Sequence, residues 1–503
     1  MHDMLRRALN ARVTDVLPAP TPVDQAPLLS ARLGTTVLLK REDLTPIFAF
    51  KIRGAYNRIA QLDERQQRAG VIAASAGNHA QGVAYAAQRL GLRATIVMPR
   101  TTPSIKIDAV RRLGAEIELV GDDYAAAAAR CEVRAAETGM TVVPPFDDLD
   151  VIAGQATVGL EILRQAPRDL GTIFVPIGGG GLASGVAAVV KELRPDIRVI
   201  GVEPEDSDAM TRSLAVGERV VLDHVGIFAD GVAVRQVGVH TFALCQRYLD
   251  DCITVSIDQI CGAIKDAFDE TRSVLEPAGA VALAGLQHMA ATSGLGRGAA
   301  IAIASGANMN FARLRYVTER AEIGERREAV LAVTIPETPG AFREFCAAIG
   351  ERSVTEFNYR LASRDEAHVF LGIEVGGRDE AATLIEALAT AGYRSVDLTD
   401  DDLAKTHVRH MVGGRARDVG AEMLFTFEFP ERPGALMQFL THLGSRWNIS
   451  LFHYRNHGSA FGRVLCAFEV PPNERPELAE RLAELGFSYV DETENPAVRL
   501  FLR

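Results

Sequence analysis

The sequence predicts an α/β protein of two lobes with open, twisted sheets, followed by a separate domain of two α+β sandwich subdomains. Three observations predict this fold. The first 320 or so residues alternate short β-branched runs with alanine-rich helical patterns. Near residue 327 this alternation stops, and the rest of the chain repeats itself. The length of 503 residues is too great for one ordinary core and favours two to four domains.

The first part of the chain contains short apolar runs of the kind that form buried strands. In chain order they are TTVLLKRED, GVIAAS, ATIVMP, EIELVG, TIFVPIGGG, RVIGVE and AAIAIASG. Helical patterns lie between them and predict a largely parallel sheet with helices on both faces. So many strands exceed one small sheet, which indicates two packed lobes. The arginine-rich N-terminus carries Asp3 and Asp15 and lacks serine, so we interpret it as a helix ending before Pro18, not as a transit peptide.

The last part of the chain contains an internal repeat. The first copy contains VTIPETPGAFREFCAAIG and the second contains the similar FEFPERPGALMQFLTHLG, so Gly340 matches Gly434, and 434 − 340 = 94. The first copy also contains FNYR and the second FHYR, so Phe357 matches Phe452, and 452 − 357 = 95. Each copy is predicted to run strand, Pro-Gly turn, helix, strand, strand, helix and a short final strand. The predicted domains are residues 1–322, 328–412 and 420–503.

The composition excludes some classes of function. Lys plus Arg is 54 and Asp plus Glu is 65, which gives a net charge of −11 and argues against a nucleic-acid partner. No apolar run reaches membrane-spanning length, so no membrane partner is expected. The six cysteines are scattered and none forms a C-x-x-C pair. This usage predicts a reduced, cytoplasmic protein, and no metal site is expected.

The stretch FAFKIRGA sets Lys51 among apolar residues. Such a lysine is either a snorkelling side chain with its amine in water or a nucleophile. The stretch by itself does not decide between the two.

The stretch SAGNHAQGVAYAA lies between a predicted strand and a predicted helix. The first amides of a helix have no internal partners and its dipole favours an anion, so a carboxylate could bind there. The residues concerned are Ser75, Gly77, Asn78 and His79. The alternative is that Asn78 simply caps the helix.

The stretch VPIGGGGLASGVAAVVKEL places Gly178, Gly179, Gly180 and Gly181 between a strand and a helix. Glycines let backbone amides approach a phosphate closely, and no Gly-Lys-Ser/Thr follows, so this is not a nucleotide P-loop. The stretch also loosely fits a dinucleotide pattern that ends at Ala183, with an acidic residue, Glu203, after the next strand. A tight helix-packing turn is the third interpretation.

Two weaker motifs follow predicted strands or open helices. SGANMNF places Ser305 at a strand end, where ligands collect in open α/β folds, and EPAGA places Glu276 before a helix. Together the motifs suit pyridoxal 5'-phosphate. Lys51 would hold its aldehyde, the glycine loop its phosphate, Ser305 its pyridine nitrogen and Asn78 its ring hydroxyl, with Phe50 packed on the ring.

The motifs and their order resemble those of the fold type II pyridoxal-phosphate enzymes, and within them the biosynthetic threonine dehydratase family. The matching stretches are KRED, FKIRGAY, SAGNHAQGVA, VPIGGGGLASGVA, FADGVAV, EPAGA, SGANMNF, EFNYR and LFHYRNHG. By this resemblance Lys51 is the Schiff-base lysine, and the segment from Ser75 to His79 takes the substrate carboxylate. The implied cofactor-binding residues are Phe50, Lys51, Asn78, Gly178, Gly179, Gly180, Gly181, Leu182 and Ser305.

The resemblance implies deamination of L-threonine to 2-oxobutanoate and ammonia, the committed step towards isoleucine, in a homotetramer with two ACT-like regulatory subdomains. Isoleucine would inhibit the enzyme and valine would counteract isoleucine. The chain departs from the family at Ala49, where serine is usual, and at Thr45, where glutamine is usual. These departures bear on rate and substrate preference.

Three alternatives stay open. The first is another enzyme of the same fold, such as a serine dehydratase, a serine racemase or a threonine synthase, although these usually lack the C-terminal repeats. The second is a nicotinamide-dependent dehydrogenase, which rests on the loose glycine pattern and Glu203. The third is a non-catalytic amino-acid sensor built on the repeats.

The repeats also offer a candidate effector site. Tyr359-Arg360 and Tyr454-Arg455 occupy matching places, each just inside a predicted strand. Neighbouring side chains of a strand point to opposite faces. We therefore expect each tyrosine to line an effector pocket while its arginine faces the sheet partner or the catalytic domain. The alternative is that both tyrosines are core residues.

Overall fold

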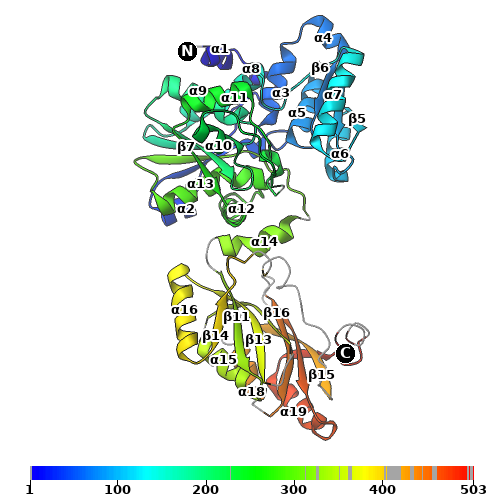
Figure 1. The fold of residues 1–503 in the computed structure, drawn as a ribbon, viewed down its shortest axis with the longest axis vertical. Helices are drawn as coiled ribbons and strands as arrows, with labels where there is room; N and C mark the ends of the chain where they lie inside the picture. Colours follow the sequence, from blue (N-terminus) through cyan, green and yellow to red (C-terminus); the bar gives the residue numbers. More distant parts are fainter. Residues whose placement is uncertain are drawn as a thin grey trace. The chain divides into compact units, whose positions relative to one another are not determined.

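The structure is a computed structural model. It describes residues 3–226, 228–311, 313–324, 328–350, 352–360, 365–401, 404, 421–430, 435–443, 446–455, 461–495, 498 and 502. The chain divides into two compact units, residues 1–324 and 325–503 (Figure 1).

The first unit contains a small parallel sheet with strand order β5-β4-β3-β6. Its strands are β3 (Val71–Ala74), β4 (Ala94–Met98), β5 (Glu116–Leu119) and β6 (Thr141–Val142). The helices that precede or connect these strands are α3 (Lys51–Ala60), α4 (Glu64–Ala69), α5 (Asn78–Leu90), α6 (Ser104–Arg112) and α7 (Tyr124–Thr138). Parallel strands need such crossovers, since a two-residue turn cannot join them. β3 and β4 are buried along their whole length, as apolar runs of this kind predict.

The first unit also contains a larger sheet with strand order β1-β2-β10-β7-β8-β9. Its strands are β1 (Val23–Gln25), β2 (Val37–Arg41), β7 (Leu170–Pro176), β8 (Arg198–Pro204), β9 (Asp251–Val255) and β10 (Ala299–Ala304). All neighbours are parallel except β1, an antiparallel edge strand on β2. The accompanying helices are α2 (Pro27–Leu33), α8 (Leu149–Gln165), α9 (Gly181–Leu193), α10 (Ala209–Val216), α11 (Val239–Tyr248), α12 (Ile257–Thr271), α13 (Pro277–Thr292) and α14 (Arg313–Gly324).

The two-lobed α/β prediction is confirmed, and each predicted strand is present. Three short or polar strands, β1, β6 and β9, were not predicted. The N-terminal helix is not continuous up to Pro18: α1 spans Asp3–Leu9 and a 3₁₀ turn follows at Arg12–Asp15. The break has a physical cause, because the Arg12 amide donates to Asn57 and its guanidinium to the Ala60 carbonyl, both on α3.

The second unit is one antiparallel sheet of eight strands, in the order β14-β11-β13-β12-β16-β17-β15-β18. The first repeat is β11 (Glu328–Pro336), α15 (Ala341–Ile349), β12 (Val354–Arg360), β13 (Glu366–Glu374), α16 (Arg378–Thr390) and β14 (Arg394–Asp397). The second is β15 (Glu422–Pro430), α18 (Ala435–Leu443), β16 (Asn448–Arg455), β17 (Phe461–Glu469), α19 (Arg475–Leu485) and β18 (Ser488–Asp491). Each repeat has the predicted order of helices and strands, and the Pro-Gly turn of the second repeat, Pro433-Gly434, lies outside the described residues. The predicted junction at residues 412–420 lies outside the described residues.

The two repeats join edge to edge through β12 and β16. In that antiparallel pair Phe357 lies opposite Tyr454 and Tyr359 opposite Phe452. Side chains from both repeats then form a single apolar core against the helices. One shared sheet hides an edge strand of each repeat, which removes two exposed edges.

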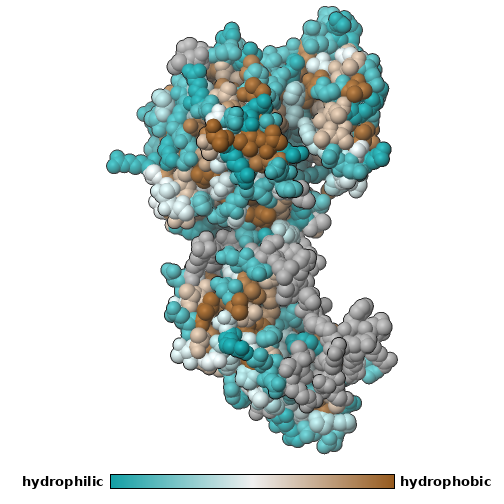
Figure 2. All heavy atoms as spheres, viewed as in Figure 1, coloured by the Kyte–Doolittle hydropathy of each residue, from teal (hydrophilic) through white to brown (hydrophobic). Residues whose placement is uncertain are grey.

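The surface drawn in Figure 2 is mainly hydrophilic, with hydrophobic residues gathered in places. Among the described residues, no helix combines the length and apolar character that crossing a bilayer requires.

Candidate active site

The residues predicted to bind the cofactor converge on one pocket of the first unit. Nine of them line it: Phe50, Lys51, Asn78, Gly178, Gly179, Gly180, Gly181, Leu182 and Ser305. They come from the starts of α3, α5 and α9 and from the carboxyl end of β10. The pocket encloses about 450 Å³, counting the space open to solvent at its mouth. Its place at strand ends and helix starts is where open α/β sheets bind ligands.

Lys51 is the first residue of α3 and is partly buried. Its Nζ atom donates to the carbonyl of Pro145 at 2.7 Å and lies 5.2 Å from the centre of the Phe50 ring. Burial lowers the pKa of Lys51 from 10.5 to about 8. A lysine in this setting is neutral in a larger fraction near neutral pH than an ordinary lysine, and a nucleophile or a base requires the neutral amine. The snorkelling interpretation is therefore not supported.

The glycine loop joins β7 to α9 in a conformation that side chains oppose. Gly180 has φ +93°, in the left-handed region. A Cβ atom at Gly179 would lie 2.2 Å from the ring of Phe146, and one at Gly178 would lie 2.8 Å from the Cα of Val232. The loop is thus packed as tightly as the helix-turn interpretation expects. It also opens α9, whose first amides are available to an anion.

Ser305 and Phe50 are joined through the backbone. The Phe50 amide donates to the Ser305 carbonyl at 3.1 Å, and the Ser305 hydroxyl donates to the Ala278 carbonyl at 3.3 Å. An isolated bridge pairs Ala49 with Gly306 beside them. The segment before Lys51 is therefore held directly against the end of β10.

Asn78 opens α5 with its side chain directed into a polar cluster. Its amide nitrogen donates to a Glu276 carboxyl oxygen, and its amide oxygen accepts from Asn308 at 2.7 Å. Burial raises the pKa of Glu276 to about 7. Glu276 is therefore a carboxyl group poised between its two protonation states near neutral pH, next to the predicted cofactor.

The segment predicted to take the substrate carboxylate is divided. Of its side chains, only that of Asn78 lines the pocket. The Ser75 hydroxyl accepts from the amides of Gly77 and Ala80, both at 3.3 Å, and the N-cap residue of α5 is Gly77 rather than Asn78. The His79 ring lies 2.8 Å from the Val143 carbonyl. Burial, and after it the charge of Lys51, lowers the pKa of His79 to about 3, so this ring is neutral.

These residues fit pyridoxal phosphate. An aldehyde needs an amine with a lowered pKa, which Lys51 provides. A phosphate needs backbone amides without obstructing side chains, and the four glycines that line the pocket at the start of α9 provide them. A hydroxyl, an amide and an aromatic ring are present in the same pocket at Ser305, Asn78 and Phe50.

The dehydrogenase alternative fails at Glu203. This carboxylate is fully buried and accepts from the Met210 amide at 2.9 Å and from the amide and hydroxyl of Thr211, both at 2.8 Å. It therefore secures the start of α10 instead of facing a ribose at the glycine loop.

The structure adds pocket residues that sequence reasoning did not assign. They are Phe146, Pro176, Gly231, Val232, Glu276 and Ala278. EPAGA and FADGVAV were noted as motifs, and the charged residue before a helix in EPAGA was the available signal for Glu276. Phe146 had no local signal, since its role depends on a contact with a loop 33 residues on (179 − 146).

In the second unit, Tyr359 lines a pocket that both repeats form. Its hydroxyl donates to Glu337 at 2.6 Å, and Asn448 of the second repeat donates to the other oxygen of Glu337 at 2.8 Å. Burial raises the pKa of Glu337. The other lining residues include Ile335, Phe342, Leu440, Trp447 and Ile449.

The other candidate effector residues occupy different settings. Arg360 forms an ion pair with Glu422 on β15 of the other repeat and donates to the Leu502 carbonyl at 2.9 Å. Both tyrosines belong to the shared apolar core, with Tyr359 3% and Tyr454 9% exposed, and of the two Tyr359 also lines the pocket. The side chain of Arg455 lies outside the described residues.

The chain is similar to known proteins over its whole length. Residues 15–306 match the family described as pyridoxal-phosphate dependent enzyme, and residues 319–408 and 413–502 each match the C-terminal regulatory domain of threonine dehydratase. The chain is 53% identical over 504 residues to the L-threonine dehydratase biosynthetic IlvA of Burkholderia multivorans, which covers 100% of this chain and 99% of that protein.

Two solved structures are similar to about two thirds of the chain. The processed form of threonine deaminase isoform 2 from Solanum lycopersicum has a TM-score of 0.62 and 48% identity, and covers 63% of this chain and 92% of that one. Maize serine racemase has a TM-score of 0.58 and 33% identity, and covers 63% of this chain and 96% of that one. The racemase thus matches over nearly its whole length, while 37% of this chain (100 − 63) lies outside the match. On these grounds the chain belongs to the biosynthetic threonine dehydratase family of pyridoxal-phosphate-dependent enzymes.

Proposed function

We propose that the protein deaminates L-threonine to 2-oxobutanoate and ammonia with pyridoxal 5'-phosphate, the first committed step of isoleucine biosynthesis. The observation that carries this proposal is the convergence of Lys51, Asn78, the glycine loop and Ser305 on one pocket. The reaction removes a proton from Cα and expels the β-hydroxyl, so the pocket must supply a base and exclude competing chemistry.

Lys51 acts as the base. When bound, pyridoxal phosphate supplies a conjugated ring that stabilises negative charge at the substrate Cα. Because burial brings the pKa of Lys51 to about 8, a useful fraction of its amine is neutral near neutral pH and accepts the Cα proton. The Pro145 carbonyl at 2.7 Å from Nζ orients this amine.

The remaining pocket residues bind and orient. The amides of the glycine loop and the start of α9 would hold the phosphate, with Gly178 to Leu182 as the binding segment. Phe50 would pack on the cofactor ring and Asn78 would bond its hydroxyl. Ser305 would face the ring nitrogen, and because a hydroxyl does not stabilise a positive charge as a carboxylate does, that nitrogen would stay uncharged. An uncharged nitrogen would favour β-elimination over transamination.

The substrate carboxylate is assigned to the start of α5. Ser75, Gly77, Asn78 and His79 surround the first turn of that helix, where backbone amides and the helix dipole favour an anion. Since the ring of His79 is directed to Val143, its contribution is through the backbone.

We propose that isoleucine inhibits the enzyme at the pocket around Tyr359 and that valine counteracts it. The pocket offers an apolar wall for a branched side chain and the Glu337 carboxyl for an ammonium group. Because both repeats line the pocket, an amino acid bound there would bias their relative arrangement, as an allosteric effector must. Tyr454, Arg360 and Arg455 remain candidates for the same regulation.

We also propose a cytoplasmic homotetramer, as the family resemblance implies, with domains at residues 1–322, 328–412 and 420–503. None of the six cysteines, all of which lie among the described residues, forms a disulfide, which suits a reducing compartment.

The test is a product assay with L-threonine and L-serine as competing substrates. A threonine dehydratase forms 2-oxobutanoate with the higher kcat/KM, and isoleucine lowers that rate. A serine racemase, the alternative that shares the fold, would instead form D-serine from L-serine, and isoleucine would not change its rate. Predominant D-serine formation, or no turnover of either substrate, contradicts the proposal.

A further inference from the structure

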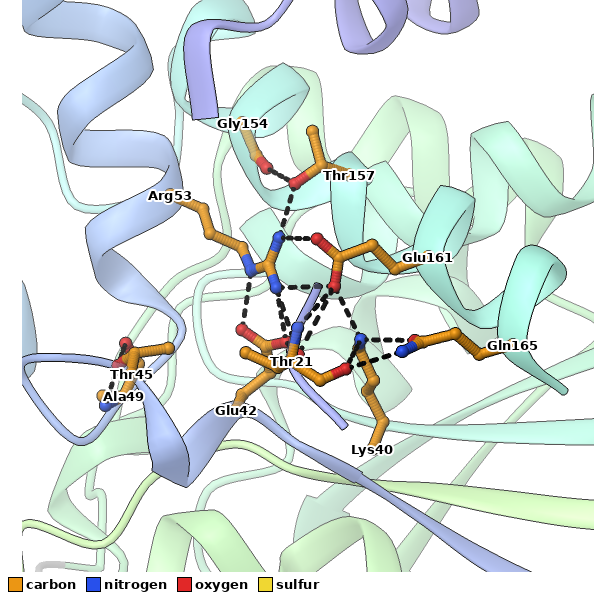
Figure 3. A network of polar contacts seen from close by, with 10 residues as sticks. All are labelled: Thr21, Lys40, Glu42, Thr45, Ala49, Arg53, Gly154, Thr157, Glu161 and Gln165. Atoms are coloured by element: carbon orange, nitrogen blue, oxygen red, sulfur yellow. Dashed lines mark hydrogen bonds and ion pairs between the residues drawn. The ribbon is translucent and has the colours of Figure 1, made fainter. Parts of the chain in front are cut away.

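A network of buried charges lies behind the helix that carries Lys51 (Figure 3). Arg53, Glu42 and Lys40 are each 0% exposed, and the side chain of Glu161 is 13% exposed. Arg53 donates to both Glu42 oxygens, at 2.7 and 2.8 Å, and to both Glu161 oxygens, at 2.6 and 2.8 Å. Lys40 donates to Glu161 at 2.6 Å. Two cations and two carboxylates therefore form a balanced set.

The polar side chains around these four ions complete the network. Thr157 accepts from Arg53 at 3.0 Å, and Thr21 donates to Glu42 at 2.6 Å. Gln165 accepts from Lys40 at 2.9 Å. Such saturation compensates the desolvation of the ions, but a buried ion network is weak evidence for added stability, because apolar residues of similar volume often serve as well. A role in fixing position is the better explanation here.

The network connects the first turn of α3 to neighbouring elements. Arg53 is two residues after Lys51, a rotation of about 200° around a helix, so the two side chains leave on nearly opposite sides. Figure 3 shows the Arg53 side chain reaching from α3 to Glu161 on α8 and to Glu42, which follows β2. The side of the turn away from the pocket is thus tied to two other elements.

The backbone of the same turn is in close contact with its neighbours. A Cβ atom at Gly154 of α8 would lie 2.5 Å from the Arg53 carbonyl oxygen and 2.6 Å from the Gly54 Cα. A Cβ atom at Gly82 of α5 would lie 3.2 Å from the Lys51 carbonyl oxygen. The glycines let α5 and α8 approach the turn, and Arg53 sets its position along that contact.

No side chain caps the start of α3. Its N-cap residue, Phe50, makes no side-chain cap hydrogen bond, and a helix end without a cap is the part that opens first. Lys51 stands at that end. Four hydrogen bonds from one planar guanidinium to two carboxylates are the geometry that best resists such opening.

Burial lowers the pKa of Lys51. Because the Arg53 side chain leaves α3 on the other side of the helix, the network bears on Lys51 through the backbone of the turn that the two residues share.

We propose that Arg53 is a positioning residue for Lys51: by joining α3 to Glu42 and Glu161, it fixes where the Lys51 amine meets the cofactor and the substrate. The inference rests on the proposed role of Lys51. A lysine replaces the charge of Arg53 but not its planar fork, so the network predicts that Arg53→Lys keeps the fold and displaces the amine.

The experiment compares four full-length proteins: wild type, Arg53→Lys, the charge-balanced Arg53→Met/Glu42→Gln, and Arg32→Lys. Arg32 on α2 forms an ion pair with Asp266 on α12 through two of its guanidinium nitrogens. Arg32→Lys removes that two-point contact at a place that does not involve Lys51, so it serves as the control. Cofactor-free protein is mixed with pyridoxal phosphate, and the rate at which borohydride fixes the cofactor on the Lys51 peptide is measured. Melting temperature, kcat and KM for L-threonine are measured beside it.

In both Arg53 variants, we expect the cofactor to attach to Lys51 about 10- to 100-fold more slowly, and kcat for L-threonine to fall by the same factor. KM should change little. Small misplacement of a reacting group has effects of this size. Arg32→Lys is expected to keep both rates. Wild-type rates in Arg53→Lys overturn the proposal, as do rate losses that follow the melting temperature across all four proteins. If the double variant does not fold, Arg53→Lys decides. If borohydride fixes no cofactor on Lys51 in the wild-type protein, the proposed function itself is wrong.

Discussion

The hydroxyl of Thr45 holds both backbone groups of Ala49: it donates to the Ala49 carbonyl at 2.8 Å and accepts from the Ala49 amide at 2.9 Å. Both residues are buried, and both are positions where the chain departs from its family resemblance (Figure 3). The two departures thus form one local structure. A side chain closes the turn that precedes Phe50 and Lys51.

Thr45→Val should destabilise the protein by about 1–3 kcal/mol, because it leaves a buried amide and a buried carbonyl without a partner. Denaturant unfolding of the cofactor-free protein measures this change. Thr45→Ser keeps the hydroxyl and is the control, with a smaller loss. An unchanged free energy of unfolding in Thr45→Val would show that water or another group satisfies Ala49.

Gly180→Asp should lower both cofactor affinity and stability. A carboxylate at this place repels a phosphate, and its Cβ would lie 2.9 Å from the Met210 Cε and 2.9 Å from the Thr241 Cβ at φ +93°. Cofactor titration and a melting curve of the cofactor-free protein measure the two effects.

Gly217→Asp separates the two effects of that substitution. Gly217 also has a left-handed φ, +82°, but nothing lies within 4 Å of its Cβ position and it does not line the pocket. This control should lose about 1 kcal/mol of stability and keep wild-type cofactor affinity. If Gly180→Asp binds the cofactor with wild-type affinity, the glycine loop has a packing role only.

Lys51 should make stability depend on pH in a defined window. Its pKa is about 8 in the folded protein and 10.5 ordinarily, so between these values the unfolded chain binds more protons than the folded one. The free energy of unfolding of the cofactor-free protein therefore rises with pH from about 8 to about 10.5 through this group. Urea unfolding across that range, in wild type and Lys51→Met, measures it. Identical pH slopes in the two proteins contradict a lowered pKa.

Tyr359→Leu should weaken isoleucine inhibition while threonine turnover without effector stays near wild type. The substitution removes the hydroxyl that donates to Glu337 at 2.6 Å, in a pocket of the second unit. Inhibition curves with and without valine measure the effect. Tyr454→Leu is expected to act in the same direction if that tyrosine also faces an effector. A lowered melting temperature with a wild-type isoleucine response would show that the mutated tyrosine only packs in the core to which both tyrosines belong.

Much of this architecture follows from local patterns. Lys51, Asn78, Gly180 and Ser305 could be assigned because each stands next to a strand or helix boundary, and parallel strands bring such boundaries to one edge. The repeats likewise predicted the order of elements in the second unit.

What local pattern could not supply are contacts between distant segments. The ring of Phe146 against the glycine loop, the Asn78–Glu276 hydrogen bond and the turn of His79 towards Val143 all depend on tertiary packing. The joining of the repeats through β12 and β16 is of the same kind, because an edge pairing has no signal in either strand alone.

The most direct test of the central claim is 2-oxobutanoate formation from L-threonine by wild type and by Lys51→Ala, each saturated with pyridoxal phosphate. We predict that Lys51→Ala folds and retains some cofactor without a covalent bond. Its rate should fall by about 10²- to 10⁴-fold or more, because it lacks both the covalent attachment and the base. Near-normal 2-oxobutanoate formation by Lys51→Ala would contradict the account.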